Sequence, residues 1–196
     1  MKLFNIIVAM DKKNGIGRGG VLPWHLPADL RHFRELTSAN KEGKKNIVIM
    51  GRKTWESLPQ KYRPLPNRIN FILSRNNRNQ EGLVIEDKLS ASSEEVYVVS
   101  GVEHAMSIIE TQLVDIAGDV YVIGGQQIFE LVIDNECCHK IYATHILHEF
   151  DCDVFFPPFQ DKFKKITTSD ILYDLGIPFY FAEYLRCDSS EVKDIS

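Results

Sequence analysis

Residues 22–33 read Leu-Pro-Trp-His-Leu-Pro-Ala-Asp-Leu-Arg-His-Phe, and this stretch predicts where the first helix begins and which face it buries. Pro27 suits the first helical position, where a missing N–H costs nothing. Leu26, Leu30 and Phe33 recur at helical spacing, with Asp29 one turn before Phe33 on the same side. A carboxylate beside a buried stripe needs a cation or a hydrogen-bond donor. The alternative is that Asp29 faces water and only favours the helix dipole.

Apolar runs rich in valine and isoleucine alternate with helical patterns along the rest of the chain. The expected strands are Leu3–Met10, Asn46–Met50, Arg68–Leu73, Leu83–Ile85, Glu95–Val99, Val120–Ile123 and Lys140–His145. The expected helices are Pro27–Thr37, Thr54–Leu58, Val102–Glu110 and Gln126–Val132. From Phe163 to Arg186 the chain alternates around a turn signal at 175–178. We therefore expect a single-domain α/β fold with a mixed, mainly parallel central sheet, helices on both faces and an antiparallel C-terminal strand.

Length and composition are those of an ordinary globular protein. The 196 residues are 44% hydrophobic and 26% charged, which predicts one domain over 1–187 and a polar tail at 188–196. A net charge of −4 argues against bulk attraction to nucleic acid or a membrane. The four cysteines lack CxxC spacing, the histidines lack metal-ligand spacing, and no signal-peptide pattern opens the chain. We expect reduced thiols, no metal, a cytoplasmic location and a monomer.

Polar residues follow several of the expected strands, at the edge where such a sheet binds ligands. The stretches are Gly51-Arg52-Lys53-Thr54, Ser74-Arg75 and Gly124-Gly125-Gln126. Cations, hydroxyls and backbone amides at a helix start suit an anion such as a phosphate. Each stretch alone is also compatible with a solvated turn, but together they favour a dinucleotide.

The glycine-rich segment after the first strand does not form a dinucleotide fingerprint. Residues 15–20 match GxGxxG by letter, but Val-Leu-Pro-Trp follows where the fingerprint requires a helix. We expect instead a flexible lid over a site at residues 14–20, the alternative being a solvated turn. Together with Asp29, these patterns predict a dinucleotide beside a small, flat, cationic or amidine-like substrate, because a carboxylate accepts two parallel N–H bonds from such a group.

Many ordered segments match one known pattern. They are Ile6–Ala9, Gly15–Trp24, Leu26–Phe33, Val48–Pro59, Arg63–Asn70, Leu73–Arg75, Val122–Gly125, Thr144–Ile146 and Asp153–Pro157. Through them the chain resembles the dihydrofolate reductase family over essentially its whole length. It departs from common family members at Asp29, where animal-type members usually carry Glu, and at Phe129, where Tyr is common near the nicotinamide. Gly101 lies where many members place a cofactor-binding Arg.

The resemblance implies roles for particular residues. Asp29 would be the pterin-binding acid, supported by Thr144 and, through water, by Trp24. The substrate-binding residues would be Ile7, Val8, Phe33, Leu58, Leu65, Arg68 and Ile123, with the carbonyls of Ile7 and Ile123 on the pterin and Arg68 on the glutamate α-carboxylate. The cofactor-binding residues would be Ala9, Ile16, Gly17, Arg52, Lys53, Thr54, Ser74, Arg75, Gly124, Gly125 and Gln126, with a cis Gly124–Gly125 bond. Of these, Ser74 and Arg75 are expected at the 2′-phosphate.

The resemblance also implies an activity. This is NADPH-dependent reduction of dihydrofolate by hydride transfer to C6 and protonation at N5, which supplies one-carbon metabolism and thymidylate synthesis. The expected small-molecule partners are dihydrofolate and antifolate-type inhibitors. Two alternatives are a pyrimidine reductase of riboflavin synthesis and a non-catalytic paralogue that binds a pterin or a nucleotide. The 63–68 motif and the spacing from Trp24 to Asp29 argue against the first, and the intact Asp29, glycine pair and basic strand ends argue against the second.

Overall fold

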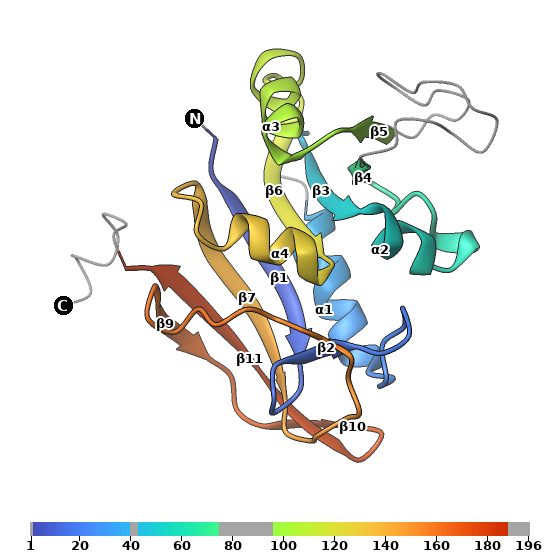
Figure 1. Ribbon diagram of the computed structural model, residues 1–196, viewed down its shortest axis with the longest axis vertical. Coiled ribbons are helices and arrows are strands. Elements are labelled where there is room, and N and C mark those ends of the chain that lie inside the picture. The colour runs from blue at the N-terminus through green and yellow to red at the C-terminus, as the bar shows by residue number, and fades with distance from the viewer. Residues whose placement is uncertain (1, 40–42, 75–95, 188–196) are drawn as a thin grey trace.

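A nine-stranded sheet forms the centre of the protein in the computed structural model, which describes residues 2–39, 43–74 and 96–187 (Figure 1). Its strands are β1 (Phe4–Met10), β3 (Lys45–Gly51), β4 (Arg68–Leu73), β5 (Val96–Val99), β6 (Ala117–Gly124), β7 (Cys138–Ile146), β9 (Phe163–Thr168), β10 (Leu172–Asp174) and β11 (Ile177–Arg186). A separate pair consists of β2 (Gly15–Gly17) and β8 (Val154–Phe155). The helices are α1 (Pro27–Ser38), α2 (Arg52–Ser57), α3 (Val102–Thr111) and α4 (Gln126–Val132), with a 3-10 turn at Gln60–Tyr62.

The sheet is mainly parallel, as predicted. Its strand order is β10-β11-β7-β1-β6-β3-β4-β5, and the strands from β7 to β5 all run parallel. The antiparallel part is β11, which pairs with β7 on one side and with β9 and β10 on the other. Because β1, β3, β4 and β6 are parallel, their carboxyl ends meet at one edge, where ligands bind in open α/β sheets.

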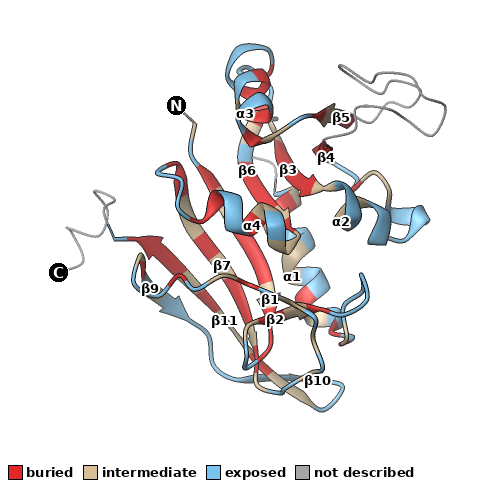
Figure 2. Cartoon of the chain, viewed as in Figure 1, coloured by how far each residue is buried: buried red, intermediate tan, exposed pale blue. Residues whose placement is uncertain are grey.

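Helices cover both faces of the sheet, which confirms the predicted fold class. In Figure 1, α3 and α4 lie in front of the sheet and α1 lies behind it. The side chains of β1 alternate accordingly: Ile6 and Val8 join the larger core beneath α3 and α4, whereas Ile7 joins a smaller core beneath α1 and α2. Figure 2 shows the central strands as the most continuously buried part of the ribbon.

The predicted apolar stripe of α1 is wrong at Leu30. Its side chain is 47% exposed, whereas that of Leu26 is 1% exposed. Leu26 precedes the helix and packs with Trp24, Ile146 and Phe179. Helical spacing therefore identified the helix, but Leu30 lies on its solvent-accessible side while Asp29 next to it is buried.

Several boundaries also differ from the predictions. Helix α2 begins at Arg52 rather than Thr54, and β7 begins at Cys138 rather than Lys140. The short strands β2 and β8 were not predicted, because strands of three and two residues are too short to show a period-two pattern. The turn predicted at 175–178 is confirmed, since Leu175 and Gly176 have positive φ between β10 and β11. The predicted strand Leu83–Ile85 lies outside the described residues.

The four cysteines are free thiols, as expected. Burial raises the pKa of Cys138 to about 12, so this thiol stays protonated and inert at neutral pH. In the described ranges, no helix combines the length and apolar character needed to cross a membrane.

His145 makes the stability of the fold depend on pH. Burial, followed by the charge of Lys165, lowers its pKa from the ordinary 6.5 to about 4, and its Nε2 lies 2.8 Å from the Tyr184 hydroxyl. The unfolded chain therefore binds this proton at a higher pH than the folded protein does. Its contribution to stability is complete above pH 6.5 and is lost as the pH falls toward 4. We expect a loss of about 1–2 kcal/mol, reduced by the partial exposure of the ring.

Urea unfolding of the variant His145→Phe across this pH range checks the prediction. Phenylalanine keeps the stacking on Tyr180, whose ring centroid lies 4.8 Å from that of His145, but it does not titrate. The variant should lose less stability than the wild type on acidification. His104→Gln, at an exposed position, should behave as the wild type does. An acid slope equal to that of the wild type in His145→Phe would contradict the assignment.

Candidate active site

Asp29 and Thr144 form a buried hydrogen-bonded pair at the start of α1. Asp29 is the third residue of the helix, and Thr144 lies on β7 beside Ala9 of β1. The Thr144 hydroxyl donates to Asp29 Oδ1 over 2.7 Å, and both residues are less than one-tenth exposed. This confirms that Asp29 does not face bulk water, which was the alternative left open by the sequence.

The environment of Asp29 disfavours its charge. Burial raises the pKa of its carboxyl, and the hydrogen bond from Thr144 lowers it by a smaller amount. Among the described residues, no cation shifts the pKa of Asp29, and Thr144 supplies the side-chain hydrogen bond to it. A buried carboxylate in this state is stabilised by a ligand that brings N–H donors or positive charge. The pair is therefore suited to hold a flat, amidine-like group.

Trp24 lies close to the elements that carry this pair. Its side chain is 7% exposed and packs with Leu26, with Ala9 and Ala28 at the border of the same cluster. Its ring centroid is 5.3 Å from that of Phe150. The indole Nε1–H is buried and lacks a protein partner in the described part of the chain. An unpaired buried donor of this kind is a site for an ordered water or a ligand atom.

Most of the residues predicted to bind substrate meet in one apolar cluster. Ile7 and Leu65 are buried in it, and Phe33, Leu58 and Ile123 pack against it half-buried. Val8 is the exception, because its side chain points into the core on the opposite face. Only the main chain of Val8 could therefore contact a ligand on this side.

Arg68 lies at the end of this cluster as a buried cation. It is 5% exposed, and its guanidinium carbon lies 5.7 Å from the centre of the Phe33 ring. Its Nη1 donates to the Thr37 hydroxyl over 2.7 Å and its Nε to the Pro66 carbonyl over 3.0 Å. Burial, with a smaller effect from Arg34, lowers its pKa to about 10, so it stays charged at neutral pH. No carboxylate pairs with it within the described ranges, which makes it a candidate for an anionic ligand group.

The predicted cofactor residues lie mainly at the carboxyl ends of β3, β4 and β6. Thr54 of α2 meets the glycine pair: its Oγ1 would lie 3.2 Å from a Cβ on Gly125. Gly124 has a φ of 115°, and a Cβ there would lie 3.2 Å from the Phe129 ring, so only glycine fits. The Gly124–Gly125 peptide bond is cis, as the family resemblance implied.

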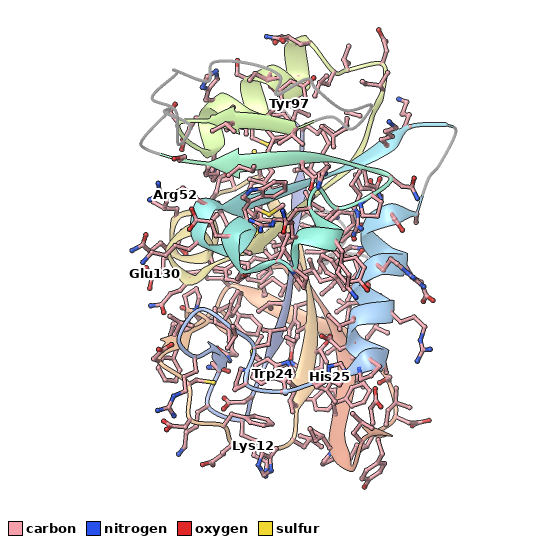
Figure 3. The ribbon with its side chains drawn as sticks, turned by 90° about the vertical axis from the view of Figure 1, so that its right-hand side faces the viewer. Lys12, Trp24, His25, Arg52, Tyr97 and Glu130 are labelled. Carbon is pink, nitrogen blue, oxygen red and sulfur yellow. The ribbon has the colours of Figure 1, made fainter. Side chains whose placement is uncertain are left out.

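The side chains at this edge have the chemistry that a dinucleotide needs. Arg52 and Lys53 are exposed, with Arg52 Nε 3.7 Å from Glu56 Oε1. Figure 3 shows Arg52 reaching outward from α2. Ser74 follows β4, which is the parallel neighbour of β3, so its hydroxyl lies on the same edge. Arg75, predicted at the 2′-phosphate, lies outside the described residues. Cations and hydroxyls at adjoining strand ends fit phosphate groups.

The remaining predicted cofactor residues belong to the segment around β2. Ile16 is partly buried against the larger core, and Gly17 is buried where β2 meets Val154 of β8. Gln126 joins the two regions, because its Oε1 accepts a hydrogen bond of 2.9 Å from the Phe155 amide. The expected lid at 14–20 thus contains a short strand rather than being a free loop throughout. Its motion stays a prediction.

A hollow of about 600 Å³ lies apart from these residues, between α3 and the turn before β7. Its lining includes Phe4 and Val102 of the larger core, which places it on the opposite face from Asp29. Four carboxylates line it: Glu103, Glu110, Asp134 and Glu136. This sign of charge repels phosphates and carboxylates, so the hollow does not suit the predicted ligands.

The sequence analysis missed two residues that position the site. Asp174, at the end of β10, accepts a hydrogen bond of 2.7 Å from the Ala28 amide and so caps α1 next to Asp29. No local signal identifies it, because 146 residues separate the partners. Asn70 bonds both the amide and the carbonyl of Leu65 at 3.0 Å and thereby holds the loop that carries Leu65. An asparagine within an otherwise apolar predicted strand was the only signal in the sequence.

Comparison with known proteins agrees with this geometry. The family model of dihydrofolate reductase matches residues 3–186. A dihydrofolate reductase of Aedes albopictus is 36% identical over 94% of this chain and 97% of its own length, and one of Schistosoma mansoni is 35% identical over 92% and 94%. The bifunctional dihydrofolate reductase-thymidylate synthase 2 of Arabidopsis thaliana is 36% identical over 98% of this chain. The chain spans 33% of that longer protein. The chain belongs to the dihydrofolate reductase family.

Proposed function

We propose that this chain reduces dihydrofolate to tetrahydrofolate with NADPH, by hydride transfer to C6 and protonation at N5. The observation that carries the proposal is the buried Asp29–Thr144 pair, whose carboxylate has no cationic partner among the described residues. Asp29 would accept two parallel N–H bonds from the pterin, which is flat and amidine-like. The product would supply one-carbon metabolism and thymidylate synthesis.

The residues of the site would bind, orient and protect the substrate. The charge of Asp29 raises the basicity of the bound ring and so favours the proton at N5, while a water near the unpaired Trp24 Nε1–H would deliver it. Phe33, Leu58 and Leu65 would hold the rings in an apolar cleft that excludes bulk water. Arg68 would pair with the carboxylate of the glutamate tail.

The cofactor site would lie along the carboxyl ends of β3, β4 and β6. NADPH, when bound there, supplies the hydride. Lys53 and Thr54 would contact its pyrophosphate, and Ser74 with Arg75 its 2′-phosphate, whereas an NAD site offers an acid to the ribose. Gly124 and Gly125 let the main chain of β6 approach closely. Phe129 is 2% exposed, and it offers a ring to pack against but no hydroxyl.

Loss of the near-ultraviolet absorbance of NADPH in the presence of dihydrofolate tests the proposal. We expect turnover with NADPH, weaker use of NADH and inhibition by antifolate-type compounds. Reduction of the pyrimidine intermediate of riboflavin synthesis in place of dihydrofolate would assign the chain to the other reductase. Binding of a pterin or a nucleotide without turnover would make it a non-catalytic paralogue. A cytoplasmic location and a monomeric state stay predictions.

A further inference from the structure

Asp11 is a buried carboxylate to which neither the sequence motifs nor the proposed function assigns a role. It follows directly after β1 and is 3% exposed. A buried carboxylate is costly unless its oxygens accept hydrogen bonds. Its backbone already closes a tight turn, because the Asp11 amide donates to the Gly15 carbonyl over 2.9 Å and the Asn14 amide to the Asp11 carbonyl over 3.0 Å.

The carboxylate of Asp11 joins two segments that are distant in sequence. Oδ1 accepts hydrogen bonds of 2.8 Å from the amides of Lys13 and Gly15. Oδ2 accepts one of 2.9 Å from the Phe150 amide, and the Cys152 thiol lies 3.9 Å from the same oxygen. Hydrogen bonds to an ionised acceptor are stronger than those between neutral groups. The side chain thus holds the segment before β2 against the segment before β8.

Both segments lead directly to residues of the candidate active site. Gly15 immediately precedes Ile16, which is expected to bind the cofactor. Phe150 packs on Trp24, the indole next to the Asp29–Thr144 pair. Figure 3 places Trp24 and Lys12, the neighbour of Asp11, at the same end of the molecule. The Asp11 carboxylate is therefore connected through Gly15 to Ile16 and through Phe150 to Trp24.

Gly15 lies too close to Cys152 to carry a side chain without a shift of one of the two segments. A Cβ on Gly15 would lie 2.5 Å from Cys152 Sγ and 2.6 Å from Cys152 Cβ. The side chain of Cys152 thus packs directly against the main chain of Gly15, at the place where Asp11 joins the two segments.

We propose that Asp11 is a positioning residue for the reductase reaction, which sets Ile16 and Trp24 relative to each other by bonding the amides of Gly15 and Phe150. The inference rests on the proposed function. Displacement of reacting groups by about 1 Å can cost up to about a hundredfold in rate without loss of binding. Loss of the Asp11 carboxylate should therefore lower kcat more than it raises KM.

Asp11→Asn is the direct test, because asparagine keeps the shape but offers only one oxygen as acceptor. We expect kcat to fall about tenfold or more, with KM for dihydrofolate and NADPH within about threefold of the wild type. Hydrogen exchange at the amides of Gly15 and Phe150 should accelerate, and the fluorescence of Trp24 should change. Arg186→Lys is the matched control: Arg186 is also a buried polar residue, but it bonds the carbonyls of Ile133, Asn135 and Cys138 at the opposite edge of the sheet. It should lower stability and leave kcat unchanged.

A second pair of variants perturbs the same contact and leaves the Asp11 carboxylate chemically unchanged, although a Cβ on Gly15 would also lie 3.0 Å from Asp11 Oδ1. Gly15→Ala should reproduce the loss of kcat, because its Cβ pushes the two segments apart. Cys152→Gly, which removes both of the nearest atoms, should restore part of it in the double variant. The inference is overturned if kcat of Asp11→Asn stays within twofold of the wild type, if Arg186→Lys loses as much, or if Gly15→Ala is fully active. A wild type that reduces no dihydrofolate would instead overturn the proposed function, and exchange at Gly15 and Phe150 would still report on the Asp11 contacts.

Discussion

Asp29→Asn should lower the rate of dihydrofolate reduction at neutral pH by about a hundredfold or more. The variant keeps the size of the side chain and can still accept a hydrogen bond from Thr144. It loses the negative charge that binds the pterin and raises its basicity, and contributions of this kind to proton transfer are about 10²–10⁴-fold. The rate should recover partly as the pH falls, because more of the substrate is then protonated in solution. Steady-state rates across the pH range, with NADPH saturating, measure both effects.

The same substitution should stabilise the free protein. Burial raises the pKa of Asp29 above the ordinary 3.8, so the unfolded chain gives up this proton at a lower pH than the folded protein does. Ionisation of Asp29 therefore opposes folding, and the penalty grows as the pH rises through and above 3.8. Asparagine removes the penalty at neutral pH. Thermal melting should show a higher midpoint for Asp29→Asn than for the wild type.

Two controls separate the charge from the packing. Asp115→Asn, at an exposed position, should change neither the rate nor the stability by much. Thr144→Val keeps the carboxylate but removes the hydrogen bond that lowers the pKa of Asp29, so the acid limb of the pH–rate profile should move to higher pH. A rate for Asp29→Asn near that of the wild type at neutral pH would refute the role of the acid.

Arg68→Leu should weaken the binding of dihydrofolate by about thirtyfold, which corresponds to about 2 kcal/mol. The buried guanidinium has no carboxylate partner within the described ranges, and its neighbours are the Thr37 hydroxyl and the Pro66 carbonyl. A bidentate bond to the glutamate carboxylate would supply that partner. Equilibrium titration with dihydrofolate, and with a pterin that lacks the glutamate, measures the effect. Only the first ligand should lose affinity.

Neighbouring variants make the test specific. Arg68→Lys should recover little affinity, because an ammonium cannot form the planar, two-pronged contact. Arg34→Leu removes an exposed cation whose charge acts on Arg68, and it should cause a smaller loss that salt abolishes. If Arg68→Leu weakened both ligands equally, Arg68 would only shape the cleft, through its contact with Phe33.

The sequence alone determined the class of the fold and the order of its elements. Alternating apolar runs and helical patterns depend on near neighbours, so the parallel strands, the start of α1 at Pro27 and the turn before β11 could be predicted from them. The polar residues at the strand ends could also be found, because a parallel sheet brings all such ends to one edge. The family motifs then assigned roles that spacing by itself left open.

The tertiary structure decided which of these residues work together. Helical spacing placed Asp29 and Leu30 on one stripe, but only the packing of α1 on the sheet, where Asp29 meets Thr144 of β7, buries Asp29 and leaves Leu30 exposed. Asp174 caps α1 from 146 residues away, and Asp11 meets Phe150 across 139 residues. Strands β2 and β8 exist only because the chain brings them together. Such contacts have no local signature, because a hydrogen bond between distant segments depends on the path of the whole chain and not on the residues beside either partner.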